Sequence, residues 1–276
     1  MDSLNSHGIK SNFLSHVLLN REMGMIHSIF SNSFNLLFRK QLVHVGKKHE
    51  GVSAFGLVLP EHLVNVIIQT GEVGNRVIWN EEKLAIYTRS QTFEINTKLY
   101  EIVDCRVPIV SNGVMEFLEK LKLFPIAEKT DVLKTEQDFL KVKDFLAANL
   151  DDSDFQNDFI RHFIGRGRGL TPSGDDLLMG IMLGVLAFGG GNWVSLLKQQ
   201  LRTVQTTYVS HAYYEALLEG YTSSFFVELL QAVGEQKWEK LDLLIEKIST
   251  YGHTSGWDTL CGLHLYLENK KGEMLK

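Results

Sequence analysis

Short apolar runs alternate with polar turns over the first 125 residues, which is the pattern of β-strands. The runs are rich in Val, Ile, Phe and Tyr, and turns of Gly, Asn and Glu, such as that at 79–83, separate them. Strands this closely spaced favour antiparallel pairing in a small barrel or sandwich. Short helices are expected at 61–69 and 114–121. The predicted strands cover residues 41–45, 53–59, 76–79, 84–87 and 92–95.

Beyond residue 130 the apolar positions recur every three to four residues, as they do on one face of a helix. The run at 177–188 is apolar almost all round, which predicts a buried helix. Residues 122–134 contain Pro125, show no clear period and are the expected linker. The sequence therefore predicts an α+β fold, with a β-rich domain at 1–125 and an α-helical domain at 130–276. The predicted helices cover residues 136–148, 152–163, 177–188, 193–209, 211–233, 237–249 and 256–269.

A glycine-rich, basic stretch precedes the buried helix and reads Ile-Gly-Arg-Gly-Arg-Gly-Leu-Thr-Pro-Ser-Gly-Asp-Asp at 164–176. Glycine permits backbone angles closed to other residues and lets a ligand approach the main chain. We expect Thr171 to cap the helix and Pro172 to be its first residue. Asp175 and Asp176 then fall in the first turn, where the helix dipole favours negative side chains. A flexible basic loop that leads into a helix N-terminus is typical of an anion site.

The same phrase occurs twice in the helical half. Residues 173–180 and 255–262 share the pattern Ser-Gly-x-Asp-x-Leu-x-Gly. Each copy begins a helix and places an aspartate at the same position of its first turn, Asp176 in one copy and Asp258 in the other. The alternative is that both copies are only well-capped helix starts, and a single copy would fit either explanation equally well. Two copies of so particular a phrase predict that the two helix starts meet in one shared site.

Glycines at the end of the first copy have a packing role. Gly180 and Gly184 are four residues apart and therefore lie on one face of the buried helix. Their small size predicts close packing against another helix.

The residues around the two phrases divide by chemistry. The loop arginines would hold a phosphate or carboxylate through charge-assisted hydrogen bonds. The paired aspartates would orient an amide or ammonium group or share a magnesium ion, or else would only complement the helix dipoles. His253, just before the second helix start, is an acid–base candidate. The candidate catalytic residues are Asp176, Asp258 and His253, and the candidate substrate-binding residues are Arg166, Gly167, Arg168, Gly169, Thr171, Ser173, Gly174, Asp175, Thr207, Ser210, Thr254, Ser255 and Gly256.

Composition and charge exclude several classes of protein. A length of 276 residues fits one large or two ordinary domains, and 44% hydrophobic residues are ordinary for a soluble protein. A net charge of −5 and a pI of about 6.1 argue against a general nucleic-acid binder. No HExxH, Walker phosphate loop or Gly-x-Ser-x-Gly elbow supports the common hydrolase and kinase mechanisms.

The expected location is the cytoplasm. Cys105 and Cys261 are far apart and lack CxxC spacing, so neither a zinc site nor a disulfide framework is expected, and a reducing compartment fits. The N-terminal residues contain no basic region that leads into an apolar run, so no secretory signal is expected. The apolar run at 177–188 is shorter than the about 20 residues that span a bilayer. No association with a membrane is therefore predicted. The sequence contains no recognised metal or cofactor motif, so neither a metal nor a cofactor is predicted.

The two phrases also carry a family resemblance. Gly-Leu-Thr-Pro-Ser-Gly-Asp-Asp at 169–176 and Gly-His-Thr-Ser-Gly-x-Asp at 252–258 resemble the signature of a family that includes the AllH subunit of the three-component oxamate carbamoyltransferase of allantoin (purine) breakdown. Between the two phrases, Thr207, Ser210 and Gly220 resemble a second, weaker pattern of the same family. The resemblance covers the C-terminal half well and the β-rich half only in outline. It implies a carbamoyltransferase subunit that acts on carbamoyl phosphate and oxamate, together with partner subunits and without a cofactor.

Three hypotheses follow for the function. The chain is a catalytic or substrate-binding carbamoyltransferase subunit, or a non-catalytic accessory subunit whose loop binds an anion or nucleotide, or a small-metabolite enzyme that uses two aspartates and magnesium. The first should bind carbamoyl phosphate. The second should bind partner proteins and should not be stabilised by carbamoyl phosphate or oxamate, and the third should require a divalent metal.

Overall fold

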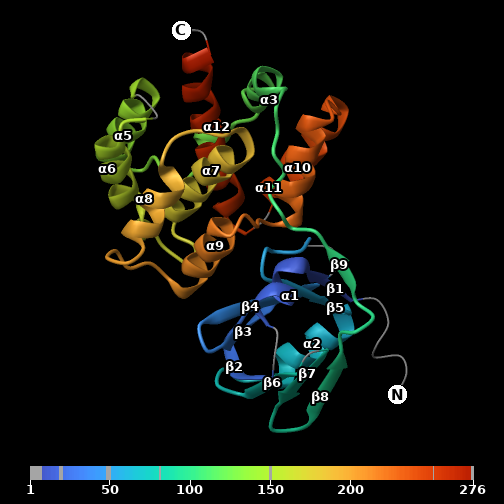
Figure 1. Ribbon diagram of the computed structural model, residues 1–276. Coiled ribbons are helices and arrows are strands. Elements are labelled where there is room, and N and C mark those ends of the chain that lie inside the picture. The colour runs from blue at the N-terminus through green and yellow to red at the C-terminus, as the bar shows by residue number, and fades with distance from the viewer. Residues whose placement is uncertain are drawn as a thin grey trace. The chain divides into compact units, whose positions relative to one another are not determined.

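Two compact units make up the computed structural model, which describes residues 8–18, 21–47, 51–80, 82–148, 151–250 and 252–274 (Figure 1). The first unit comprises Met1–Cys105 and Tyr221–Ser224, and the second comprises Arg106–Gly220 and Phe225–Lys276. A sheet dominates the first unit and helices dominate the second, which confirms the predicted α+β class.

The first unit is built on one curled sheet of nine strands among the described residues. The strand order is β8-β7-β6-β2-β3-β4-β5-β1-β9. Pairing is antiparallel as predicted except for β4 with β5 and β1 with β9, which are parallel. The elements are β1 (Ile9–Ser11), α1 (Asn12–Val17), β2 (Glu22–Ile29), β3 (Phe34–Phe38), β4 (Gln41–Lys47), β5 (Gly56–Leu59), α2 (Glu61–Thr70), β6 (Arg76–Asn80), β7 (Lys83–Tyr87), β8 (Thr92–Asn96) and β9 (Glu101–Val103).

Every second side chain along β6, β7 and β8 is buried in the core of this unit. Trp79, Leu84 and Ile95 occupy matched positions on β6, β7 and β8, and all three are buried. Matched positions on neighbouring strands face the same side of a sheet, so these side chains pack together. The sequence did not predict β1, β2, β3 or β9. Strands β1 and β9 are three residues long, and the residues of β2 and β3 do not alternate regularly between buried and exposed positions.

The second unit packs its helices around α7 and α12, which lie at its centre in Figure 1. Burial extends over α7 from Ser173 to Val185, as the apolar run predicted. The elements are α3 (Val114–Leu121), α4 (Ile126–Lys129), α5 (Glu136–Ala147), α6 (Ser153–Phe163), α7 (Ser173–Phe188), α8 (Trp193–Gln200), α9 (Tyr208–Leu218), α10 (Ser224–Gly234), the 3₁₀ helix η3 (Trp238–Lys240), α11 (Leu241–Ser249) and α12 (Ser255–Met274).

Two predicted helices, 193–209 and 211–233, have the wrong boundaries. The first ends at Gln200, and the chain turns before α9 begins at Tyr208. The second is interrupted after Leu218, where Gly220 has a φ of +83° that ends the helix. Apolar residues continue through these turns because they pack on the same core, so the helical period does not reveal the breaks.

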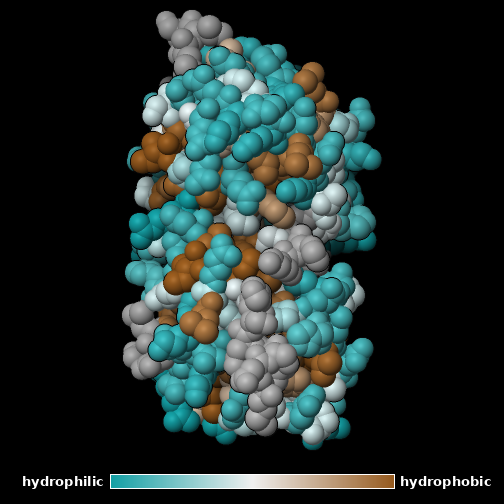
Figure 2. All heavy atoms as spheres, turned by 90° about the vertical axis from the view of Figure 1, so that its right-hand side faces the viewer, coloured by the Kyte–Doolittle hydropathy of each residue, from teal (hydrophilic) through white to brown (hydrophobic). Residues whose placement is uncertain are grey.

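Hydrophilic residues cover most of the face shown in Figure 2, and hydrophobic residues form separate patches on it. Within the described ranges, each helix is too short or too polar to cross a membrane.

Candidate functional site

Helices α7 and α12, which carry the two phrases, cross at the last glycine of each phrase. A Cβ atom on Gly180 would lie 2.0 Å from the Thr259 carbonyl oxygen, and one on Gly262 would lie 1.9 Å from that of Leu177. The two contacts are reciprocal. The last glycine of each phrase faces a carbonyl group of the other phrase, three residues before that phrase's own last glycine. A Cβ atom on Gly184 would likewise lie 2.3 Å from the ring of Tyr266 of α12, which confirms the predicted close packing.

The first glycine of each phrase closes a corner between two consecutive helices. A Cβ atom on Gly174 would lie 2.2 Å from the Phe163 carbonyl oxygen at the end of α6. A Cβ atom on Gly256 would lie 1.9 Å from the Ile248 carbonyl oxygen near the end of α11. The pairs α6–α7 and α11–α12 thus repeat one local arrangement. For Gly256, this contact is the packing reason for its place in the phrase.

The two helix starts meet in space, which confirms the prediction drawn from the repeat. Thr171 Oγ1 lies 2.7 Å from Ser255 Oγ, 84 residues further along the chain. The predicted cap is wrong, because α7 has Pro172 at its N-cap and no side-chain capping bond. The Thr171 hydroxyl instead reaches the other helix start.

Asp176 is a buried carboxylate at this meeting point. Its residue is 4% exposed, and its Oδ2 atom has no hydrogen-bond partner among the described residues. Burial raises the pKa of Asp176 well above its usual value, and the negative charge of Asp258 adds to this effect. Hydrogen bonds from the Ser255 and Thr171 hydroxyls oppose the increase. The group is therefore held at an energetic cost to the fold, as is common for functional carboxyls.

Asp258 occupies the equivalent place on α12 but has more partners. Its Oδ1 atom accepts a hydrogen bond of 2.8 Å from the Asp131 N–H and one from the Thr130 hydroxyl. Burial raises its pKa, and these two bonds, with the Thr254 and Ser173 hydroxyls, oppose the increase. Within the described part of the chain, Asp258 Oδ2 has no hydrogen-bond partner. Its residue is fully buried.

Asp175 ties the start of α7 to the loop before it and to α9. Its Oδ1 atom accepts hydrogen bonds of 2.8 Å from the Gly165 N–H and from the Tyr214 hydroxyl. Its Oδ2 atom accepts one from the Thr206 hydroxyl. Three donors satisfy this buried carboxylate, so its contacts are those of a structural support for the turn.

The glycine-rich loop adopts the backbone that its sequence predicts. Gly165, Gly167 and Gly169 have φ values of +69°, +127° and +92°, a region that favours glycine. The Arg166 carbonyl accepts a hydrogen bond of 2.8 Å from the Gly174 N–H, so the chain itself uses this helix-start donor. Arg168 is exposed.

The other predicted site residues are divided between the helix start of α9 and the surface. Thr207 caps α9 by accepting a 3.0 Å bond from the Ser210 N–H, and its hydroxyl donates to the Leu170 carbonyl. Ser210 is fully buried, and its hydroxyl lacks a partner among the described residues. His253 is exposed. Among the described residues, no three His, Cys, Asp or Glu side chains lie together in a way that could hold a metal ion.

Sequence reasoning missed Thr130, Asp131 and Tyr214 as neighbours of the aspartates. The first two lie in the predicted linker, and Tyr214 lies on a predicted helix among other apolar residues. No local pattern marks any of them.

A curled-sheet unit and a helical unit with two buried aspartates at interlocked helix starts define an α+β protein with a candidate small-molecule site. The sequence model of the family described as oxamate carbamoyltransferase subunit AllH matches residues 163–267. This range contains the loop and both phrases, so the predicted resemblance to that family is confirmed there. No solved structure matches the chain.

Proposed function

We propose that the chain is a subunit of an oxamate carbamoyltransferase, and that its interlocked helix starts bind carbamoyl phosphate or oxamate. The family match supports the first part of the proposal. The observation that carries the second part is the pair of buried carboxylates, Asp176 and Asp258, each with an oxygen that lacks a partner among the described residues. Burial of such groups is costly unless a hydrogen-bond donor or an opposite charge compensates for it, and a ligand can supply either.

Both proposed ligands have a terminal NH2 group on a carbonyl carbon and an anionic end. An ionised carboxylate accepts hydrogen bonds from such an NH2 group. At Asp258, the chain's own Asp131 N–H and Thr130 hydroxyl donate to the carboxylate. Asp176 has no backbone N–H donor of this kind in the described structure, so we assign the ligand NH2 group to Asp176 and an anchoring role to Asp258.

The anionic end of the ligand requires donors near Asp176. The hydroxyls of Thr171 and Ser255 meet there, and Arg168 is the exposed arginine of the same loop. The Gly174 N–H is already bonded to Arg166, so hydroxyls and Arg168 carry more of this role than the helix-start amides. Charge-assisted bonds to arginine suit both a phosphate and a carboxylate.

Carbamoyl transfer to oxamate breaks the bond between the carbamoyl carbon and the phosphate oxygen and forms a bond to the oxamate nitrogen. That nitrogen loses one proton, and phosphate leaves. A carboxylate that is hydrogen-bonded to the attacking NH2 group can orient it and accept this proton. We assign this role to Asp176.

Calorimetry of the Asp176→Asn variant with oxamate and carbamoyl phosphate tests the proposal, on the chain alone and with its partner subunits. Loss of one charge-assisted hydrogen bond should cost about 1.5–3 kcal/mol, or roughly ten- to a hundredfold in affinity. Asp154→Asn is the matched control, because Asp154 is an exposed carboxylate in the first turn of α6.

The stability of the variant distinguishes a ligand role from a structural one. Because burial of the Asp176 carboxyl group costs stability above its unfolded pKa, the Asp176→Asn variant should have an unchanged or higher melting temperature at neutral pH, although its affinity falls. Unchanged affinity would remove Asp176 from the site. No binding of either ligand by the assembled complex would favour the accessory-subunit hypothesis instead.

A further inference from the structure

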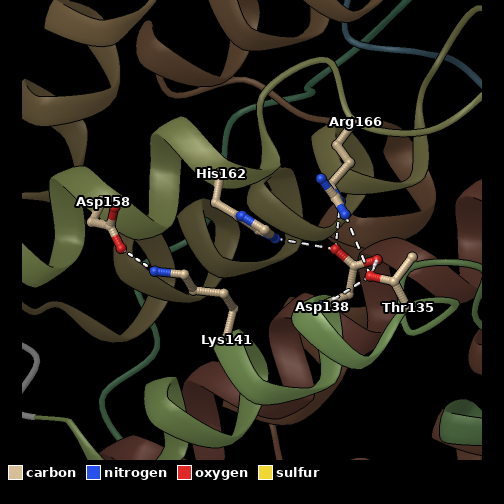
Figure 3. Close-up of polar contacts among 6 residues, drawn as sticks. All are labelled: Thr135, Asp138, Lys141, Asp158, His162 and Arg166. Atoms are coloured by element: carbon tan, nitrogen blue, oxygen red, sulfur yellow. Dashed lines mark hydrogen bonds and ion pairs between the residues drawn. The ribbon is translucent and has the colours of Figure 1, made fainter.

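A second polar cluster lies beside the loop and centres on Asp138 of α5 (Figure 3). The Asp138 carboxylate accepts a hydrogen bond from the Thr135 hydroxyl and forms an ion pair with Arg166 Nε. His162 Nε2 of α6 lies 3.1 Å from Asp138 Oδ1. Asp138 is 4% exposed, so its carboxylate lies away from water, whereas the Arg166 side chain that pairs with it is 37% exposed.

Arg166 joins this cluster to the start of α7. Its side chain pairs with Asp138 of α5, and its N–H donates a 3.0 Å bond to the Phe163 carbonyl at the end of α6. Its carbonyl accepts the 2.8 Å bond from Gly174, the second residue of α7. One residue, which lies between Gly165 and Gly167 of the loop, therefore connects three helices.

The loop requires such a fastening. Three of its five residues at 165–169 are glycines with positive φ, and glycine loses more conformational freedom on folding than any other residue. Burial would raise the pKa of Asp138, but bonds from Thr135, Arg166 and His162 together hold it below its usual value. The carboxylate is thus ionised at neutral pH and can anchor the arginine.

We infer that Asp138 is a positioning residue, which holds Arg166 and through it fixes the 164–172 turn and the α7 start that bears Asp176. Arg166 then acts on the loop and not on the ligand. The connection to catalysis rests on the proposed function, whereas the fastening of the loop does not.

Hydrogen exchange of peptides that cover 164–176 tests the fastening. Exchange there should accelerate about tenfold in Asp138→Asn and in Arg166→Gln, because a charge-assisted bond is lost. The Arg166→Lys variant should restore part of the protection. Lys141→Ala is the matched control, because Lys141 also pairs α5 with α6, through Asp158, without touching the loop (Figure 3). It should leave this exchange unchanged.

Oxamate affinity, measured on the same variants, completes the test. Asp138→Asn and Arg166→Gln should weaken binding by a similar factor, and Lys141→Ala should not. Unchanged exchange at 164–176 in Asp138→Asn would overturn the inference, as would a loss of affinity in Arg166→Gln far beyond that in Asp138→Asn. If exchange accelerates but the wild type binds neither ligand, the fastening stands and only the proposed function fails. Arg166 is partly exposed, so the Arg166→Gln variant should fold even if Asp138→Asn does not. Exchange in Arg166→Gln alone would then decide the test.

Discussion

Replacing Gly262 by alanine tests the crossing of α7 and α12 directly. The added carbon would lie 1.9 Å from the Leu177 carbonyl oxygen and 3.0 Å from the Ile181 nitrogen. Both atoms belong to the backbone of a buried helix, so the two helices must move apart. Overpacking of this kind costs about 1–3 kcal/mol, whereas alanine in place of glycine gains about 0.5–1 kcal/mol in a helix. We expect a net loss of about 1–2 kcal/mol in the free energy of unfolding.

Gly272, on the same helix, provides the control, because a Cβ atom there meets nothing within 4 Å. Gly272→Ala should therefore stabilise the protein by about 0.5–1 kcal/mol. Differential scanning calorimetry would detect both changes, since 1 kcal/mol shifts the melting temperature by about 2–4 °C in a domain of this size. If Gly262→Ala proved as stable as Gly272→Ala, the reciprocal packing of the two phrases would not be what holds the helix starts together.

Three further predictions concern the helix starts. Because burial raises the pKa of Asp176, the folded protein keeps a proton that the unfolded chain loses near pH 4. The free energy of unfolding should therefore fall as the pH rises from about 4 through the raised pKa. Urea unfolding at several pH values should show a smaller fall in the Asp176→Asn variant. Gly256→Ala should lower the melting temperature by several degrees, as Gly262→Ala does, because its Cβ would lie 1.9 Å from the Ile248 carbonyl oxygen. Tyr214→Phe removes the hydroxyl donor to the buried Asp175 carboxylate and should cost about 1.5–3 kcal/mol in chemical denaturation.

The repeat in the sequence was enough to predict that two distant helix starts meet. Such a phrase constrains both backbone and side chains, since its glycines are needed where helices approach and its aspartates where the helix dipole favours them. Gly180 also predicted a helix contact, although its partner, the Thr259 carbonyl, could not be identified from spacing alone. Burial of α7 followed from its apolar run because no face of that helix is polar.

Contacts between segments far apart in the sequence could not be predicted in the same way. Thr130 and Asp131 reach Asp258 across 128 and 127 residues, from a stretch with no regular period. Asp138 lies on a helix whose sequence shows an ordinary charged face, yet the residue is buried. The turn at Gly220 was hidden by continuous apolar spacing. Each of these depends on how separate elements pack, which a single sequence does not record.

The two copies of the phrase show how similar sequences acquire different chemistry. Asp176 and Asp258 occupy equivalent positions on helices that contact each other reciprocally, and burial raises the pKa of both. Only Asp258 receives a backbone N–H and a hydroxyl from a third segment, 130–131. The two carboxylates of the repeated phrase therefore differ in how firmly the rest of the chain holds them. Because this difference lies outside both phrases, our proposal that a ligand binds at Asp176 rests on the contacts of segment 130–131 and not on the motif.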